Sequence, residues 1–271
     1  MPLFLRPTAP AFKVVTIKIA TWNVNSIKAR QEHVLTFLKT RQPDVLMIQE
    51  LKGLEFSDSE FKTLGYDSVA ESQKAYNGVA ILSKHPITVL ENVLAGDPAD
   101  SQARYLEVSI QNMRLINIYL PNGNPVDTDK YTYKLSWMDR LKVKLQHLRE
   151  AGHEFIIGGD FNVIPEARDC HDPKVWQNDA LFRIETRRKF RELLHLGLTD
   201  AFRVYNQNPG RYTFWDYQAG AWDRNHGIRI DHFLLSPAMA DRLQSCTIDT
   251  EPRGWDKPSD HVPVILEISD K

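Results

Sequence analysis

The sequence has few cysteines and no long apolar run, and each shortage excludes a class of protein. Cys170 and Cys246 are too few for a disulfide framework, and they suit a reducing, cytoplasmic compartment. No apolar run is long enough to cross a bilayer, so we expect no membrane partner. The first fifteen residues carry Pro2, Pro7 and Pro10 and lack a continuous apolar segment, which argues against a signal peptide.

Linkers, internal repeats and an excess of charge of either sign are also missing. We therefore predict one domain over residues 16–271, preceded by an irregular N-terminal extension of residues 1–15. The net charge of −1 argues against a generally basic nucleic-acid-binding protein. A local basic face would still be enough to contact phosphates.

Apolar patterning predicts more strands than helices. Helical spacing occurs at 30–40, 131–149 and 186–196, and strands are predicted at 16–23, 45–48, 77–83, 115–120, 155–157, 212–217, 228–235 and 262–268. Segments 212–217 and 228–235 are interpreted as paired strands around a loop at 220–227. Because strands and helices do not strictly alternate, we expect packed sheets with helices outside, rather than a Rossmann sheet or a TIM barrel.

The most informative stretch is the apolar run 155–157, which stops at two glycines followed by Asp160, Phe161 and Asn162. Two residues is the period of a strand, so the polar side chains of Asp160 and Asn162 can point the same way. A polar pair at the end of a buried strand is costly unless it is hydrogen-bonded or used in function. This stretch therefore predicts part of an active site.

Similar polar clusters follow or precede other apolar runs. They are residues 22–25, Gln49 with Glu50, Asn117 and Tyr119 with Asn122, residues 229–232, and residues 259–261. Each cluster alone has an ordinary interpretation: Asn23 fits a turn, Glu50 an exposed strand end, and Tyr119 a core residue. Their occurrence together in one chain favours convergence on a single site.

The chemistry of these clusters suits phosphate-ester hydrolysis. Glu50 with Asn23, Asn25 and Asp260 offers hard oxygen ligands of the kind that Mg²⁺ prefers. Asp160 is the candidate general base, and Asn162 would orient the attacking water or the base.

Asp231 would hold His261, which could donate to a phosphoryl oxygen. A positioned general base accelerates a reaction by only ~10²–10⁴-fold. Phosphate-ester hydrolysis needs acceleration that can reach ~10¹⁷ or beyond. Electrostatic stabilisation by a metal and by donor groups must then supply the rest.

The motifs resemble those of exonuclease III and the abasic-site (AP) endonucleases, within the endonuclease/exonuclease/phosphatase superfamily. In family order they are TWNVN at 21–25, LMIQELK at 46–52, NGVAILSK at 77–84, YLPNG at 119–123, GDFN at 159–162, YTFWDY at 212–217, RIDH at 229–232 and SDH at 259–261. The resemblance covers the chain from about residue 16 to its end.

The resemblance implies an α/β fold, a four-layer sandwich of two face-to-face mixed sheets flanked by helices, with the site at one end. It implies Mg²⁺, with Mn²⁺ also able to support activity. Metal binding is assigned to Glu50, with Asn23, Asn25 and Asp260 close by. Catalytic roles fall on Asp160, Asn162, His261, Asp231, Tyr119 and Asn122. Tyr119 and Asn122 would contact the scissile phosphate.

DNA contacts are implied for a further set of residues, which comprises Lys28, Asn77, Arg104, Phe214, Trp215, Ile228 and Ile230. The last four resemble the apolar pocket that accepts a base-less sugar. Phe214 and Trp215 could equally be core aromatics, and Lys28 could be ordinary surface. His232 receives no role, and Asn25 stands where some relatives have Asp.

We therefore expect a monomeric, cytoplasmic, divalent-metal-dependent DNA repair nuclease. It would cleave duplex DNA 5′ to abasic sites and would trim or clean 3′ ends. The motifs do not rank AP endonuclease, 3′→5′ exonuclease and 3′-phosphatase activities. Two alternatives stay open: a superfamily phosphodiesterase or phosphatase on another phosphate ester, and a non-catalytic regulatory protein on the same fold.

Overall fold

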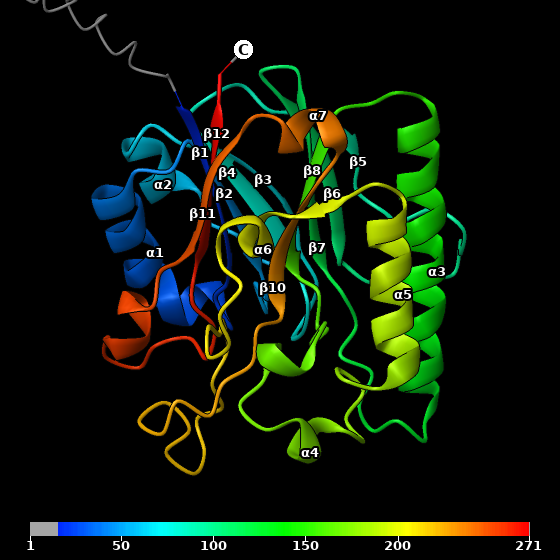
Figure 1. The fold of residues 1–271 in the computed structure, drawn as a ribbon. Helices are drawn as coiled ribbons and strands as arrows, with labels where there is room; N and C mark the ends of the chain where they lie inside the picture. The colour runs from blue at the N-terminus through cyan, green and yellow to red at the C-terminus, as the bar shows by residue number, and fades with distance from the viewer. Residues whose placement is uncertain (1–15, 271) are drawn as a thin grey trace, which may run out of the picture.

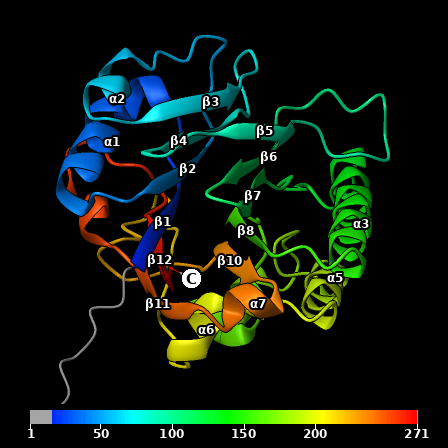
Figure 2. The same ribbon diagram turned by 90° about the horizontal axis from the view of Figure 1, so that it is seen from above.

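A computed structural model describes residues 16–270 as two six-stranded sheets that pack face to face between helices (Figures 1 and 2). This arrangement confirms the four-layer α/β sandwich predicted from the sequence. The predicted irregular extension, residues 1–15, lies outside the described residues. That extension and the single domain after it stay predictions.

The first sheet has the strand order β11-β12-β1-β2-β4-β3, and the second has the order β5-β6-β7-β8-β10-β9. The strands are β1 (Thr16–Asn23), β2 (Val45–Gln49), β3 (Asp67–Glu71), β4 (Val79–Ser83), β5 (Thr88–Glu91), β6 (Tyr105–Ile110), β7 (Met113–Tyr119), β8 (Phe155–Asp160), β9 (Thr199–Asp200), β10 (Asp231–Leu235), β11 (Leu243–Ile248) and β12 (Val264–Ser269). The helices are α1 (Ile27–Arg41), α2 (Ser59–Thr63), α3 (Asp129–Glu150), α4 (Pro173–Trp176), α5 (Ile184–His195), α6 (Ala201–Tyr205) and α7 (Pro237–Ala240), with 3₁₀ turns η1 (Ala167–Asp169) and η2 (Glu251–Gly254).

Strand direction brings the predicted polar ends to one edge of the sandwich. β1 runs parallel to β2, and β7 runs parallel to β8. A hydrogen bond joins Asn23 at the end of β1 to Asp160 at the end of β8, so all four carboxyl ends lie on the same side. β10 and β12 pair antiparallel with β8 and β1, so their first residues lie at that same edge. Residues far apart in the sequence therefore meet there.

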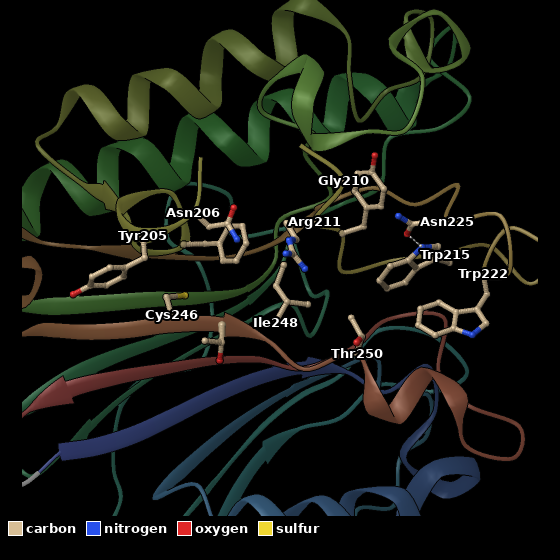
Figure 3. Close-up of a pocket in the computed structure, with 13 residues that line it drawn as sticks. Tyr205, Asn206, Gly210, Arg211, Trp215, Trp222, Asn225, Cys246, Ile248 and Thr250 are labelled. Carbon is tan, nitrogen blue, oxygen red and sulfur yellow. Dashed lines mark hydrogen bonds between the residues drawn. The ribbon is translucent and has the colours of Figure 1, made fainter. Parts of the chain in front are cut away.

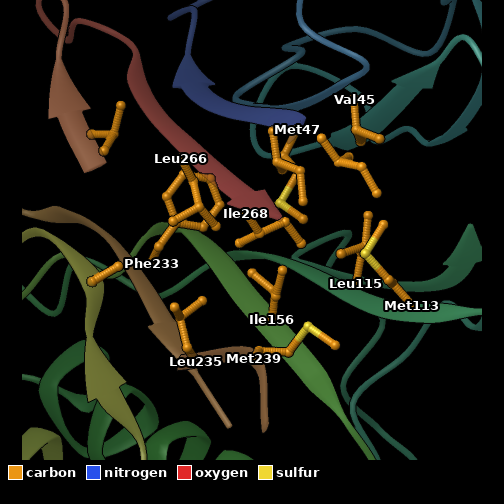
Figure 4. Packing of buried hydrophobic residues seen from close by; sticks show 14 of the residues in the cluster. Val45, Met47, Met113, Leu115, Ile156, Phe233, Leu235, Met239, Leu266 and Ile268 are labelled. Carbon is orange, nitrogen blue, oxygen red and sulfur yellow. The ribbon is translucent and has the colours of Figure 1, made fainter. Parts of the chain in front are cut away.

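The core between the sheets is apolar and draws on both of them (Figure 4). Met47 from the first sheet and Ile156 and Phe233 from the second belong to one buried cluster. Helices α1 and α2 cover the outer face of the first sheet, and α3 and α5 cover that of the second (Figure 2). Burial on both faces explains why strands such as 45–48 and 155–157 are apolar throughout.

One buried polar contact ties the two sheets together near the polar edge. The Gln49 side chain donates to Asn117 Oδ1 at 2.7 Å, and Asn117 donates to the carbonyl oxygens of Ile48 and Ala80. Asn117 is fully buried, so this polar residue has a structural role and does not contact substrate. This link fixes the relative position of the strand ends that carry the site.

The prediction of paired strands at 212–217 and 228–235 is only partly confirmed: the two segments pair at a single antiparallel bridge, and no strand ladder joins them. Residues 212–217 form only isolated bridges, because Phe214 pairs with Ile228 on one side and His261 on the other. The backbone of Thr213 likewise bonds both Ile228 and Val262, so no ladder extends in either direction. A regular strand starts only at Asp231, and it pairs with β8 instead.

The apolar pattern also failed to predict strands that contain a charged residue or are partly exposed. β6 contains Glu107, which is fully buried and paired with Arg114 and Lys144, so its pattern is interrupted by a charge. β11 and β5 lie at sheet edges and are partly exposed, so they lack a continuous apolar run. No helix among residues 16–270 is both long and apolar enough to cross a membrane.

Candidate active site

The polar strand ends meet at one site. Asn23, Tyr119 and Asp160 are the last residues of β1, β7 and β8, Glu50 follows β2, and Asp231 begins β10. The turn at Asp160 requires glycine before it, because a Cβ on Gly159 would lie 2.0 Å from a backbone oxygen of β7. Glu50 has a φ of 58°, a left-handed conformation that a non-glycine residue adopts at some cost and often at functional sites.

Asn23 joins the two carboxylates of the site. Its amide donates to Glu50 Oε1 at 2.9 Å and to Asp160 Oδ2 at 3.0 Å. The Tyr119 hydroxyl donates to the same Glu50 oxygen at 2.8 Å. Ligand atoms of Glu50, Asp160 and His261 all lie within 4.8 Å of one another, so these three residues form a possible metal-binding group.

The surroundings of Glu50 suit a cation. Lys52 Nζ lies 2.7 Å from Glu50 Oε2 and also contacts Asn25 Oδ1, while Asn25 donates to Asp260 Oδ1 at 3.0 Å. Burial alone would raise the pKa of Glu50, but the Lys52 ammonium and the Asn23 amide outweigh burial and hold that pKa below its usual range. The carboxylate is therefore charged at neutral pH, as a metal ligand must be.

Asp160 lies in the opposite kind of environment. It is 1% exposed, and burial together with the nearby Asp231 charge raises its pKa to about 7, against the lowering effect of His261. Its Oδ1 accepts the backbone N–H of Asn162 at 2.8 Å, which fixes the orientation of the carboxylate. A carboxyl group that titrates near neutral pH can act as a general base.

His261 is held by Asp231. Its Nδ1 lies 2.9 Å from Asp231 Oδ2, and its Nε2 lies 3.8 Å from Asp160 Oδ2. Although burial opposes the charge, the Asp231 and Asp160 carboxylates raise the His261 pKa to about 10. The imidazole is therefore protonated at neutral pH. Its Nε2 lies near Asp160, and both residues line the cleft.

Asn122 and Asn162 are positioned by their own network. Asn122 donates to Asn162 Oδ1 at 3.1 Å, and Asn162 donates to the carbonyl of Leu120 at 2.9 Å. Beneath them, the ammonium of the fully buried Lys134 donates to the carbonyl oxygens of both asparagines. Burial lowers the Lys134 pKa to about 7. No sequence motif marks this lysine, because it lies on the buried, apolar face of α3.

A cavity of about 260 Å³ opens onto this cluster. One wall is apolar and includes the predicted residues Phe214, Ile228 and Ile230, together with Trp176 and Leu181. The sequence pattern does not predict the last two, because Trp176 ends the one-turn helix α4 and Leu181 lies in the loop after it, where no apolar periodicity marks them. The Phe214 ring also packs edge-on against the His261 ring, with centroids 5.0 Å apart.

Trp215 does not lie with the other predicted pocket residues. It is 2% exposed and lines a separate cavity on the opposite side of the 212–215 segment (Figure 3). Successive residues of an extended segment face opposite sides, so Phe214 and its neighbour Trp215 do not both face the cleft. The structure thus corrects the expectation that Trp215 lines the sugar pocket.

A basic groove adjoins the cleft. Its cavity of about 630 Å³ shares Glu50, Tyr119, Asn122 and Asn124 with the first cavity, and its positively charged lining residues are Lys52, Arg104 and Lys130. The predicted contacts Asn77 and Arg104 both line it. Lys28 instead lies on the exposed face of α1 and lines neither cavity.

His232, to which we assigned no role, belongs to the core. Its Nδ1 lies 3.0 Å from Arg229, and its Nε2 lies 3.0 Å from the carbonyl of Val163. Arg229 in turn pairs with Asp169 and Asp200. Burial and the Arg229 charge lower the His232 pKa to about 4, so this imidazole is neutral and structural.

Comparison with known proteins places this arrangement in a family. The family model described as Endonuclease/Exonuclease/phosphatase family matches residues 20–261. An exodeoxyribonuclease of Bacillus subtilis is 30% identical over 263 residues, which cover 93% of this chain and 100% of that protein.

Two solved structures are also similar. A 3′ phosphatase, NExo, from Neisseria, bound to a product DNA hairpin, has a TM-score of 0.91 and 36% identity. An AP endonuclease from Archaeoglobus fulgidus has a TM-score of 0.89 and 38% identity. Each match covers 94% of this chain and 100% of the other. They support the predicted phosphodiester hydrolase of the exodeoxyribonuclease III type, and the chain belongs to the endonuclease/exonuclease/phosphatase family.

Proposed function

We propose that this protein is a Mg²⁺-dependent, monomeric DNA repair nuclease that cleaves duplex DNA 5′ to abasic sites and trims 3′ ends. One observation carries the proposal: Glu50, Asp160 and His261 surround a single cleft that has an apolar wall. The two free, buried cysteines are compatible with the cytoplasm, where such an enzyme would meet DNA.

The residues of the cleft have complementary tasks in this proposal. Asp160 accepts a proton from the water that attacks phosphorus, and the Asn162 N–H keeps the carboxylate in position. Protonated His261, held at Nδ1 by Asp231, donates from Nε2 to a phosphoryl oxygen as negative charge develops there. Attack forms one P–O bond and breaks the bond to the 3′ oxygen, which leaves a 3′-hydroxyl and a 5′-phosphate.

Glu50 would hold the metal, with Asn23, Asn25 and Asp260 close enough to assist. The position of the Lys52 ammonium between Glu50 and Asn25 supports this assignment, because a positive charge already fits there. A bound divalent cation would stabilise negative charge on the phosphate. Mg²⁺ fits a site with few protein oxygens, because it keeps several of its waters, and Mn²⁺ would fit similarly.

The walls of the cleft suit an abasic site. A cavity of about 260 Å³ with an apolar wall can receive a deoxyribose that has lost its base. The Tyr119 hydroxyl and the Asn122 amide lie at the shared rim of the cleft and the basic groove, where they can contact the scissile phosphate. Arg104, Lys52 and Lys130 would contact the neighbouring phosphates.

The test is cleavage of a duplex that carries one tetrahydrofuran residue, first with Mg²⁺ and then with EDTA. We expect one cut 5′ to the lesion that EDTA abolishes. Parallel reactions on 3′-phosphate and blunt duplexes measure the end-trimming activities. Asp223→Asn, an exposed carboxylate outside the cleft, is the matched control for Asp160→Asn and should cut at the wild-type rate.

No cutting of any of these duplexes with Mg²⁺ or Mn²⁺ would contradict the proposal. Release of phosphate from inositol phosphates instead would indicate a family member with another substrate. A non-catalytic regulatory protein is the less favoured alternative, because Glu50, Asp160 and His261 line one cleft and their ligand atoms lie within 4.8 Å of one another.

A further inference from the structure

A third cavity, the one that Trp215 lines, has no part in the proposed chemistry. This flank cavity has a volume of about 550 Å³ and is lined by α6, the loop that follows it, β11 and the loop around residues 215–225 (Figure 3). Its size falls in the range of small-molecule sites.

One end of the flank cavity is aromatic. Trp215 and Trp222 meet at 4.8 Å between ring centroids and at right angles, and Tyr212 packs edge-on against Trp215 at 6.2 Å. Asn225 Oδ1 accepts the Trp215 indole N–H at 3.1 Å. Trp222 keeps part of its surface exposed, and it is also held by the Arg253 guanidinium. A rigid, partly exposed indole is the kind of surface on which a flat ring stacks.

The middle of the flank cavity carries positive charge without a counter-ion. Arg211 is its sole charged lining residue, and no carboxylate lines it. Among residues 16–270, no ion pair or hydrogen bond engages the Arg211 side chain. The remaining polar lining groups include amides and hydroxyls, among them Asn206, Thr247 and Thr250. An arginine in a cavity without acids favours an anion, and phosphate matches its planar fork.

The flank cavity and the catalytic cleft lie on opposite sides of one stretch of backbone. Phe214 lines the cleft, while Tyr212 and Trp215 line the flank cavity. If the proposed function is right, nucleotides are released or unpaired at the cleft, and the flank cavity lies only one stretch of backbone away from them.

We infer that the flank cavity binds a single unpaired nucleotide, with its base against Trp222 and its phosphate at Arg211. Base stacking on an aromatic ring is tolerant of sequence, so all four bases should bind. The nucleotide could be a free monophosphate or the last nucleotide of an overhanging strand, since both present the same base and phosphate.

The test uses the tryptophan side chains as position-specific reporters in ¹⁵N NMR spectra of the full chain with Mg²⁺. The chain has six tryptophans, and Trp→Phe variants assign their indole signals. Trp215 and Trp222 report on the flank cavity, and Trp176 reports on the cleft. We expect dAMP to shift the first two signals with saturation, and deoxyadenosine or inorganic phosphate alone to bind much more weakly.

Two variants test the assignment. Arg211→Gln should weaken dAMP binding by about tenfold, the usual loss for one charge-assisted hydrogen bond. Trp222→Ala should weaken it by a similar factor, while Trp222→Phe should keep most of the affinity. Arg211→Gln should cut the abasic duplex at the wild-type rate, so a failed nuclease assay and a failed binding assay remain separate results.

The source of the nucleotide is decided with the Asp160→Asn protein and a duplex with a two-nucleotide overhang, compared with a blunt duplex. Shifts of Trp215 and Trp222 with the overhang alone identify strand binding, and shifts with dAMP identify binding of a released nucleotide. Absence of both sets of shifts would overturn the inference, as would binding that Arg211→Gln leaves unchanged.

Discussion

Glu50 and Asp160 share one amide group, the side chain of Asn23, yet they lie in opposite electrostatic environments. Glu50 stands at the end of the first sheet beside the Lys52 ammonium, and its pKa is held below the usual range. Asp160 ends a strand of the second sheet, is buried beside Asp231, and has its pKa raised to about 7. Two carboxylates a few ångströms apart can thus serve as a cation ligand and as a base.

The difference follows from how each sheet ends. The first sheet presents its strand ends toward Lys52 and the open basic groove, where charge is favoured. The second sheet ends among Phe161, His261 and the carboxylate of Asp231, which are all buried. Location within the same cleft does not determine the role of a carboxylate, but burial and neighbouring charge do.

The largest effect is expected from Asp160→Asn. The amide keeps the shape of the side chain, but it cannot accept a proton, and its NH2 group replaces one of the two oxygens that accept hydrogen bonds from Asn162 and Asn23. The rate of abasic cleavage should therefore fall by at least ~10²–10⁴-fold. Single-turnover kinetics measure the rate, and fluorescence anisotropy should show that DNA binding is retained. Turnover near the wild-type rate would remove Asp160 as the base.

The two carboxylates should also affect stability in opposite directions. Asp160 has a folded pKa of about 7 against 3.8 for the free side chain, so above about pH 4 the unfolded chain releases a proton that the folded protein still holds. The free energy of unfolding therefore falls as pH rises from about 4 to 7, and the whole penalty is present above pH 7.

Asp160→Asn should accordingly raise the free energy of unfolding of the metal-free protein at pH 8. Glu50→Gln should destabilise it, because a carboxylate with a lowered pKa contributes stability above its unfolded pKa, and this contribution is lost as pH falls. Urea unfolding in EDTA measures the free energy of unfolding of both variants. Changes of the same sign would contradict the proposed difference between the two sites.

Metal dependence sharpens the same comparison. Glu50→Gln should weaken Mn²⁺ binding by about 10–100-fold in calorimetry, and excess metal should restore part of its activity. Asp160→Asn should not respond to excess metal, since its defect is in proton transfer. Equal rescue of both variants would mean that the two roles are not separate.

The pH dependence of the cleavage rate should follow the protonation of Asp160 and His261. Below pH 7 the rate should fall about tenfold per pH unit as Asp160 is protonated, and it should fall again above about pH 10 as His261 loses its proton. Asp231→Asn should move the alkaline limb to lower pH, because the Asp231 carboxylate raises the His261 pKa. An alkaline limb that does not move would exclude this role for Asp231.

The sequence predicted that these polar side chains would lie close together, and there is a physical reason for this. A polar residue that ends a fully buried strand, such as Asn23 or Asp160, has few structural explanations, and strand direction then brings such ends together. The pattern failed where a contact depends on tertiary packing. Trp215 faces away from the cleft because Phe214 faces into it, and Lys134 is hidden on an apolar helix face.

The most direct test is a titration of side-chain carboxyl groups by ¹³C NMR in the metal-free protein, with Glu50→Gln and Asp160→Asn used to assign the two signals. The account predicts that Asp160 titrates near pH 7 and that Glu50 titrates below its usual range. Similar pKa values for the two groups, or a Glu50 pKa above that of Asp160, would contradict it.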